Sequence, residues 1–477
     1  MSEFVNPFDA AALEAIGPMA ALGLGVLALL LVGTLTHSRA ARGVVVAASL
    51  AFAASLQLDL LAGAPGEVLG GALVADRSSA LWGLLFLLAT AIAWLFSLDY
   101  YEEDRAFLLE HDALLLTTPI GMMLMAGAGD LLTFFVGLEL LSVPLYALAA
   151  FRRNRPASVE AGLKYFLLGA FAAAFFLYGA ALVYTATGTI SLVRLRDLGV
   201  DSPLALAGTG LMTASVLFKV SAFPFHLWAP DVYQGAPTPV TALMATGSKA
   251  AAFAFLLHVT FLLPASAAGT LAVLAIASMA AGNLGALVQT DLKRMLAWSG
   301  IAHAGTVLLV VSAALAGDPL TDGARDAAIY YMAAYVLTAA GAFGLVAQLE
   351  REGDRLPTLD SLRGLSARRP VVAAALVVFM LSLGGIPLTG GFLGKYLVFS
   401  ANVRADQVGI AVVGVLLSVV ALGYYLRVIV AMYMQPAPEG APTGRASTPP
   451  AAVLAAGVCT FGVLLLGVLP GWLLRQL

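Results

Sequence analysis

Residues 217–239 read LFKVSAFPFHLWAPDVYQGAPTP, an apolar stretch that holds Lys219, a histidine and several prolines. Residues 381–397 read LSLGGIPLTGGFLGKYL, in which a Gly-Gly-Ile-Pro run comes shortly before Lys395. Because proline removes a helical hydrogen bond, each stretch predicts a helix that is interrupted in its middle. Two interrupted helices, one near the centre of each half of a chain, are typical of inverted repeats with an ion pathway between them. A simple proline kink is the alternative for Pro224.

The remainder of the chain has the composition of a membrane protein. Of its 477 residues, 61% are hydrophobic and 11% are charged, and the mean hydropathy is +0.93. A helix needs about 20 apolar residues to span a bilayer. Windows of this length predict an all-α polytopic membrane protein with about fourteen transmembrane helices. They lie at roughly 17–36, 43–63, 79–97, 112–128, 130–150, 161–187, 206–229, 239–262, 267–287, 292–315, 326–348, 370–400, 409–432 and 450–474.

Several other kinds of site are excluded by the sequence. A net charge of -3 and the lack of a Lys/Arg-rich run argue against nucleic acid as a partner. The single cysteine, Cys459, can form neither an internal disulfide nor a thiolate cluster. The glycine pairs lack the flanking strand and acidic residue of a dinucleotide fold, and there is no P-loop or HExxH motif. We therefore expect neither a metal nor a bound cofactor in this chain.

The distribution of Lys and Arg predicts the orientation in the membrane. Cytoplasmic loops carry the excess of these residues. With the N-terminus outside, roughly fourteen Lys and Arg fall in cytoplasmic loops and about six outside. We therefore expect both termini on the outer, periplasmic side.

Lys293 and Arg294 stand at the very start of the 292–315 span and are counted with the preceding cytoplasmic loop. Five other cations fall inside the predicted spans: Lys164, Lys219, Lys249, Lys395 and Arg427. A charge at the centre of a membrane helix costs about 3 kcal/mol even on permissive scales, so such residues usually have a function. Burial favours the neutral form of lysine and a nearby carboxylate restores the charged form, whereas arginine stays protonated. Lysine is therefore the cation suited to load and release a proton.

Glu139, in FFVGLELLSVPLY at residues 134–146, is the clearest acid at depth. Together with Lys219, Lys249 and Lys395 it forms the candidate site for proton translocation. A structural ion pair or a snorkelling side chain is the alternative. It applies most readily to Lys164, near the start of its helix, and to Arg427, which could reach the cytoplasmic interface.

Two histidines are candidates for an accessory role. His226 follows Lys219 by seven residues, which is two helical turns if the helix continues, and His303 lies inside the tenth predicted span. Either side chain could pass protons, although a lone buried histidine is more often a satisfied core residue. The remaining histidines fit loops or interfaces.

The sequence resembles a known family, the antiporter-like membrane subunits of bacterial respiratory complex I (NADH-quinone oxidoreductase), and among these subunit N most closely. The likeness covers about residues 100–430. It rests on ELLSVPLYALAAFRRNRPASVEAGLKYFLLGA (139–170), FKVSAFPFHLWAPDVYQGAPTPVTALMATGSKAA (218–251), TDLKRMLAWSGIAHAG (290–305) and LSLGGIPLTGGFLGKY (381–396).

This resemblance implies a domain organisation. It implies N-terminal helices 1–3 in residues 1–111, then two inverted five-helix repeats at 112–265 and 266–435, with helices 7 and 12 broken. Residues 436–477 would form a cytoplasmic loop and helix 14.

The resemblance also implies roles for single residues. Glu139 would be the fifth-helix carboxylate, Lys219 the lysine of the broken seventh helix, Lys249 the central eighth-helix lysine and Lys395 the lysine of the broken twelfth helix. Lys164, His226 and His303 would be accessory residues of the proton path.

The implied function is proton translocation within an H⁺-translocating NADH:quinone reductase of the bacterial inner membrane. No redox centre is expected in this chain, and NAD, FMN, iron-sulfur clusters and quinone would bind to other subunits. The expected partners are subunits M, K, J and L and the surrounding lipid. An Mrp-type cation/proton antiporter subunit is the alternative function, and a purely structural subunit with static lysine pairs is a third.

Overall fold

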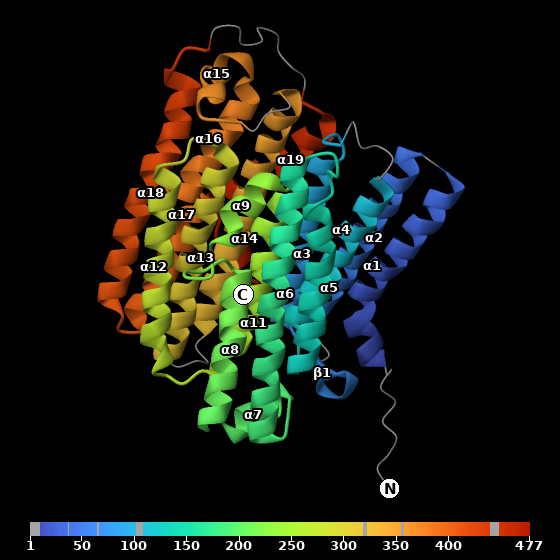
Figure 1. Ribbon diagram of the computed structural model, residues 1–477, viewed down its shortest axis with the longest axis vertical. Coiled ribbons are helices and arrows are strands. Elements are labelled where there is room, and N and C mark those ends of the chain that lie inside the picture. The colour runs from blue at the N-terminus through green and yellow to red at the C-terminus, as the bar shows by residue number, and fades with distance from the viewer. Residues whose placement is uncertain are drawn as a thin grey trace.

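The computed structural model is an elongated bundle of helices (Figure 1). It describes residues 10–36, 38–63, 66–101, 108–317, 322–353, 357–438 and 448–477.

The helices follow one another along the whole chain. The first group consists of α1 (Ala10–Leu35), α2 (Arg39–Ala62) and α3 (Arg77–Ser97). The second group consists of α4 (Leu108–Ala126), α5 (Leu131–Ala149), α6 (Pro156–Thr187), α7 (Leu192–Leu198), α8 (Pro203–Lys219), α9 (Trp228–Gly235), α10 (Thr238–Ala245) and α11 (Gly247–His258). The third group consists of α12 (Ala267–Leu287), α13 (Leu292–Ala316), α14 (Asp322–Gly353), α15 (Leu365–Arg368), α16 (Pro370–Gly384), α17 (Gly390–Arg404), α18 (Val408–Met434), α19 (Pro450–Val468) and α20 (Gly471–Leu474).

All of the predicted membrane segments are helical, which confirms the predicted fold class. Among the described residues, eleven helices are each long and apolar enough to cross a membrane. The seventh predicted segment is divided into α8 and α9, and the twelfth into α16 and α17. The eighth segment contains an interruption that the sequence did not predict, at Thr246 between α10 and α11.

The two broken segments end their first half-helix in the same way. After α8, Ser221 has a φ of +61° and the amide of Ala222 donates to the carbonyl of Leu217 at 2.9 Å. After α16, Gly385 has a φ of +82° and the amide of Ile386 donates to the carbonyl of Leu381 at 3.0 Å. A residue in the left-handed conformation, followed by an amide that donates to the carbonyl five residues earlier, is a common helix terminator, usually with glycine. Both predicted breaks are therefore helix ends rather than kinks.

The two halves of the bundle repeat their local structure. Asp130 caps α5 by accepting a bond from the amide of Thr133 at 2.6 Å, and Asp291 caps α13 by accepting one from the amide of Arg294 at 2.8 Å. Asp130 also forms a β-bridge with Ser191, ahead of α7. Gly121 contacts the backbone of α5 in the way that Gly282 contacts the backbone of α13, and the spacing between these glycines equals that between the two aspartates.

These corresponding parts lie at opposite ends of the molecule. Asp291 forms its own β-bridge with Thr358, ahead of α15. Figure 1 shows α7 at the lower end of the bundle and α15 at the upper end. The second repeat is therefore inverted relative to the first, as the sequence predicted.

A small hairpin of β1 (Gly66–Val68) and β2 (Leu73–Ala75) lies at the lower end of the bundle in Figure 1. Its strands are antiparallel, with Gly66 opposite Ala75. The amide of Val74 donates to the carbonyl of Gly127 at 2.7 Å, so the hairpin covers the turn between α4 and α5. The hydropathy windows predicted no strands here.

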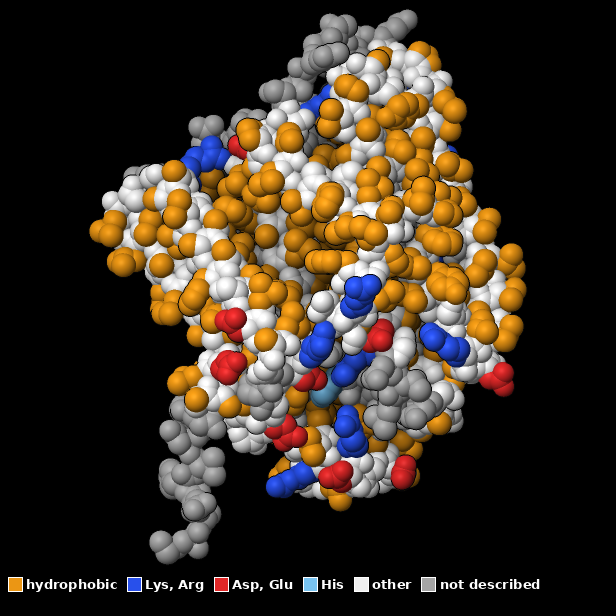
Figure 2. Space-filling model, turned by 180° about the vertical axis from the view of Figure 1, so that it is seen from behind, with side chains coloured by type: hydrophobic (Ala, Val, Ile, Leu, Met, Phe, Trp, Pro, Cys, Tyr) orange, Lys and Arg blue, Asp and Glu red, His pale blue; other side chains and the backbone are white. Residues whose placement is uncertain are grey.

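The outer surface of the bundle is largely apolar. Figure 2 shows hydrophobic side chains over a broad band of one face, with most of the charged side chains of that face toward the lower end. Large side chains such as Leu24, Phe171 and Leu416 are more than half exposed. An exposed apolar band of this extent fits a lipid environment.

Helix contact through glycine gives the first testable prediction. A Cβ added at Gly121 would lie 2.4 Å from the backbone nitrogen of Leu141, whereas one at Gly210 meets nothing within 4 Å. We expect Gly121→Ala to destabilise the protein by about 1–3 kcal/mol, because α4 and α5 must move apart. Gly210→Ala, the matched control, is expected to be neutral or stabilising, since alanine favours helix. Thermal unfolding in detergent measures both, and equal stability of the two variants would contradict this packing.

Candidate functional site

Three of the predicted lysines are almost completely buried. The exposed fraction is 4% for Lys219, 1% for Lys249 and 7% for Lys395. They lie on α8, on α11, which follows the interruption of the eighth segment, and on α17, so both repeats contribute a lysine.

Lys219 is the last residue of α8 and its ammonium group is bound by hydroxyl groups. Its Nζ donates to Ser142 Oγ at 2.8 Å and to Tyr165 OH at 3.0 Å. The same nitrogen lies 5.8 Å from the ring centroid of Tyr146 and 5.1 Å from that of Tyr165. Hydrogen bonds to oxygen and the π faces of two rings stabilise a buried cation.

Glu139 lies on α5, one turn before Ser142, and interacts electrostatically with Lys219. Its Oε1 is buried and has no hydrogen-bond partner among the described residues. The predicted pair is thus brought together, but the carboxylate and the ammonium are not in direct contact. Ser142, rather than Glu139, binds the ammonium group of Lys219.

Lys249 connects the two repeats. Its Nζ donates to the carbonyl of Gly300, on α13, at 2.8 Å. The ring centroid of Tyr233 lies 5.8 Å away. On the other side, Ser248 lies beside the hydroxyl of Tyr165, which is the partner of Lys219. The repeat spacing that pairs Asp130 with Asp291 also places Gly300 where the first repeat has Glu139.

His303 lies one turn beyond Gly300 on α13 and is bound through both ring nitrogens. Nδ1 is 2.6 Å from the hydroxyl of Tyr331, on α14, and Nε2 is 3.0 Å from that of Tyr425, on α18. His303 interacts electrostatically with both Lys249 and Lys395. The repeat spacing places His303 where the first repeat has Ser142.

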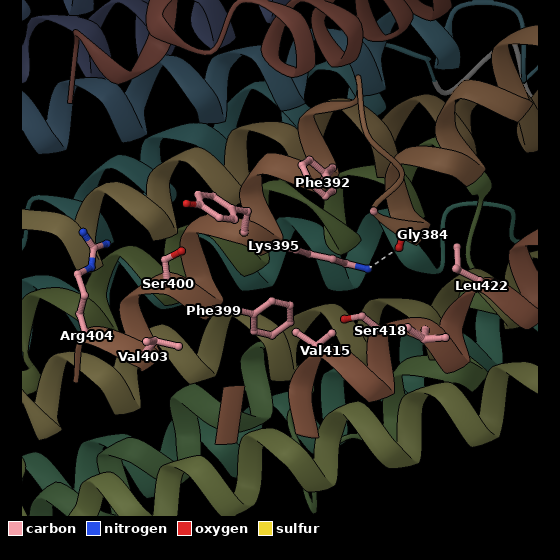
Figure 3. Close-up of a pocket in the computed structure, with 13 residues that line it drawn as sticks. Gly384, Phe392, Lys395, Phe399, Ser400, Val403, Arg404, Val415, Ser418 and Leu422 are labelled. Atoms are coloured by element: carbon pink, nitrogen blue, oxygen red, sulfur yellow. Dashed lines mark hydrogen bonds between the residues drawn. The ribbon is translucent and has the colours of Figure 1, made fainter. Parts of the chain in front are cut away.

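Lys395 binds the C-terminal end of α16, which is the first half-helix of the broken twelfth segment. Its Nζ donates to the carbonyl of Leu383 at 2.9 Å and to that of Gly384 at 3.0 Å. Figure 3 shows the bond to Gly384. The last carbonyls of a helix have no partner within it and carry its partial negative charge, so a cation there is favourable. The side chain also lines a cavity of about 550 Å³ between α17 and α18.

His226 does not lie on the same helix as Lys219. The helix ends at Lys219, so the argument from two continuous turns does not hold. His226 lies in the segment between α8 and α9, where its ring centroid is 5.6 Å from that of Trp298. Its Nδ1 is buried without a partner among the described residues.

Lys164 differs from the other lysines because its side chain is 41% exposed. Its Nζ lies 2.7 Å from Glu160 and 3.1 Å from Asp231. Asp231 also binds Arg294 at 2.6 Å, so the ion pairs connect α6, α9 and α13. These ion pairs form a network on the surface at one end of the bundle.

A buried ion pair was missed by the sequence analysis. Lys293 was counted among the loop cations, but its side chain is 1% exposed and its Nζ lies 3.7 Å from Glu350. Glu350 also accepts a hydrogen bond from the hydroxyl of Thr238. The amide of Thr238 donates to the hydroxyl of Tyr100 at 3.4 Å. Burial and the charge of Glu350 raise the pKa of Tyr100, so this hydroxyl remains protonated.

Ser142, Tyr146 and Tyr165 were also missed. The first two follow Glu139 by three and seven residues, so they lie on the same face of α5. That spacing is a signal that the sequence offered. Tyr165 is adjacent to Lys164 in sequence and nothing in the local pattern distinguishes it.

The described part of the chain contains no group of three or more His, Cys, Asp or Glu side chains that could hold a metal ion. Around Lys219, Lys249 and Lys395, the buried polar groups named above are hydroxyls, backbone carbonyls, Glu139 and His303 with its two tyrosine partners. Groups of these kinds can bind and pass protons.

Comparison with known proteins connects this geometry to a family. Residues 128–421 match the model of the family described as "NADH:quinone oxidoreductase/Mrp antiporter, TM". NADH-quinone oxidoreductase subunit N of Myxococcus xanthus (strain DK1622) is 42% identical over 470 residues, which cover 91% of this chain and 90% of the relative. The chain belongs to this family.

Solved structures agree with the assignment. A chain of respiratory complex I from Thermus thermophilus with bound aureothin has 38% sequence identity and a TM-score of 0.81, covering 96% of this chain and 98% of that chain. A chain of the Mrp complex from Dietzia sp. DQ12-45-1b has a TM-score of 0.85 but 22% identity, over 97% and 96% of the two chains. The second likeness shows a shared fold. The resemblance to complex I subunits inferred from the sequence is confirmed.

The buried ion pair and the exposed network predict different effects of substitution on stability. Glu350→Gln leaves Lys293 without its partner in the interior, so we expect a loss of about 3 kcal/mol or more. The Asp231 side chain is 40% exposed. Asp231→Asn removes its carboxylate from the surface network and should lower the free energy of unfolding by at most about 1 kcal/mol. Thermal unfolding of the two variants in detergent tests the difference. A shift for Asp231→Asn as large as that for Glu350→Gln would show that the exposed network is structurally essential.

Proposed function

We propose that this chain is the proton-translocating, antiporter-like subunit N of NADH-quinone oxidoreductase, respiratory complex I. It works as part of a translocase, in which NADH:quinone electron transfer drives proton pumping across the membrane. The 42% identical subunit N and the complex I structure support this function. The Mrp complex is a distant relative at 22% identity, so the alternative antiporter function has less support.

A row of buried polar groups carries the proposal. Lys219 contacts Tyr165, and Tyr165 lies beside Ser248, which is next to Lys249. Lys249 donates to Gly300, one turn from His303. Each repeat contributes groups to the row, and Lys395 lies at its far end. A buried row of this kind crosses the bundle laterally.

Glu139 and Lys219 form the site where coupling begins. Because the ammonium group binds Ser142 and is not in direct contact with the carboxylate, a change in the position of either charged side chain alters their attraction. Approach of Glu139 favours the charged lysine, and withdrawal favours release of the proton. Redox work in other subunits would supply the movement. Each charge moved against 100 mV costs about 2.3 kcal/mol.

The proton then moves from Lys219 to Lys249 and on through His303 to Lys395. Tyr331 and Tyr425 hold the imidazole with their hydroxyl groups, which can donate or accept. Lys395 is the last carrier before release to the outer side. His226, beside Trp298, and Lys164, in the exposed ion pairs, are accessory residues of this path.

The likeness to subunit N supports the remaining parts of the proposal. This chain carries no cofactor, and NAD, FMN, iron-sulfur clusters and quinone bind to other subunits. Subunits M, K, J and L and membrane lipid are its partners. The chain lies in the bacterial inner membrane with both termini periplasmic, and its repeats occupy residues 112–265 and 266–435.

Substitution of Lys395 tests the function. In complex I carrying Lys395→Ala, we expect proton pumping and coupled quinone reduction to fall roughly tenfold or more, because a positioned proton carrier contributes at least this factor. Lys395→Arg should be defective as well, since arginine stays protonated. Proton uptake into vesicles and NADH:quinone reductase activity measure the effect.

Assembly of the variant complex is the control, checked on a native gel. An assembled Lys395→Ala complex with the wild-type proton yield would contradict a role for Lys395 in translocation. It would leave the lysine as a cap for the carbonyl groups of α16.

A further inference from the structure

The last step of the row, from His303 to Lys395, has no direct contact. His303 and Lys395 interact electrostatically, but no hydrogen bond joins them within the described part of the chain. Both instead line one small cavity between α12, α13, α17 and α18. Its other polar lining groups are Asn283, Thr306, Ser418 and Tyr424.

The size and lining of this cavity fit one water molecule. Its volume is about 10 Å³, measured as room for a water-sized sphere. A buried water needs roughly this volume and two to four polar partners. The cavity has both.

Two of the lining groups have unused hydrogen-bonding capacity. The Oγ of Ser418 is buried and has no hydrogen-bond partner among the described residues. Buried hydroxyls are nearly always paired, with protein or with ordered water. Lys395 carries three donors, of which two bind the carbonyls of Leu383 and Gly384. A third donor therefore remains.

A second, larger cavity helps to place Ser418. The cavity of about 550 Å³ is lined by Phe392, Phe399 and Val415 among others, and Lys395 and Ser418 line it as well. In Figure 3 the Lys395 side chain, on α17, points toward the carbonyl of Gly384, and Ser418 lies nearby on α18. Because Lys395 and Ser418 line both, they form the boundary between the apolar groove and the small cavity. The unpartnered Ser418 hydroxyl is thus placed to bind a water in the small cavity.

We propose that Ser418 is a positioning residue that holds a water molecule between His303 and Lys395, and that this water passes the proton from one to the other. The inference rests on the proposed function and adds a residue to it. Ser418 itself neither gains nor loses a proton.

The step leaves every group balanced. A protonated His303 gives one N–H proton to the water while the water gives one of its own protons to the neutral amine of Lys395. The imidazole returns to its neutral form, the lysine becomes an ammonium group and the water is unchanged. One bond of His303 to Tyr331 or Tyr425 must open for the water to be reached.

Ser418→Ala in assembled complex I tests the proposal. Without the hydroxyl, we expect proton pumping to fall about tenfold, the factor that about 1.4 kcal/mol makes in a rate. Ser418→Thr retains a hydroxyl and should restore most of the pumping. The solvent isotope effect on turnover should rise in Ser418→Ala, because proton transfer becomes slower; a purely structural role would not change it.

Ser400→Ala is the matched control. Ser400 lines the larger cavity but not the small one, so this variant should pump as the wild type does. Ala421→Val tests the water directly, since Ala421 lines only the small cavity and valine would fill it. We expect the same defect as in Ser418→Ala, with the hydroxyl still present. If Ser418→Ala does not assemble, Ala421→Val decides the question.

The outcomes separate this inference from the proposed function. The water site alone would be overturned if Lys395→Ala were defective while Ser418→Ala or Ala421→Val kept the wild-type pumping and isotope effect. Wild-type pumping in Lys395→Ala would overturn the proton path as a whole. Defects in Ser418→Ala and Ala421→Val, rescue by Ser418→Thr and a silent Ser400→Ala would support the water site.

Discussion

Backbone carbonyl groups that are released at a helix break must find hydrogen-bond donors inside the membrane, and the site depends on how this chain supplies them. In the first repeat, the indole of Trp228 donates to the carbonyl of Phe218 at 3.0 Å. In the second repeat, Lys395 donates to Leu383 and Gly384. An unsatisfied group in hydrocarbon costs several kcal/mol. One break is thus closed by a neutral donor and the other by a group that can change its charge.

The three buried lysines of the row are not in direct contact with a carboxylate. Lys219, Lys249 and Lys395 all donate to hydroxyl or carbonyl oxygens. A direct ion pair in a low-dielectric interior would hold the proton tightly. Neutral acceptors stabilise the ammonium group less, so both protonation states remain within reach. A buried lysine that does pair with a carboxylate, Lys293 with Glu350, lies away from this row near the start of α10.

The sequence predicted those features that depend on local patterns. Hydropathy located the spans, Pro224 and the Gly-Gly-Ile-Pro run located both breaks, and charges within apolar segments identified the buried lysines. Lys164 shows the limit of this reasoning, because a helix in lipid is apolar on every side and its pattern does not separate an exposed face from a buried one. The acceptors could not be predicted, since Gly300 lies far from Lys249 in sequence and contributes only a carbonyl.

The proton-to-electron ratio of intact complex I carrying Lys249→Met tests the central claim most directly, because Lys249 alone joins the two repeats through a hydrogen bond in the proposed row. Methionine fills similar space without a charge. The account predicts an assembled complex whose ratio falls below that of the wild type. An assembled complex with an unchanged ratio would show that protons do not cross between the repeats at Lys249, and would contradict the lateral path.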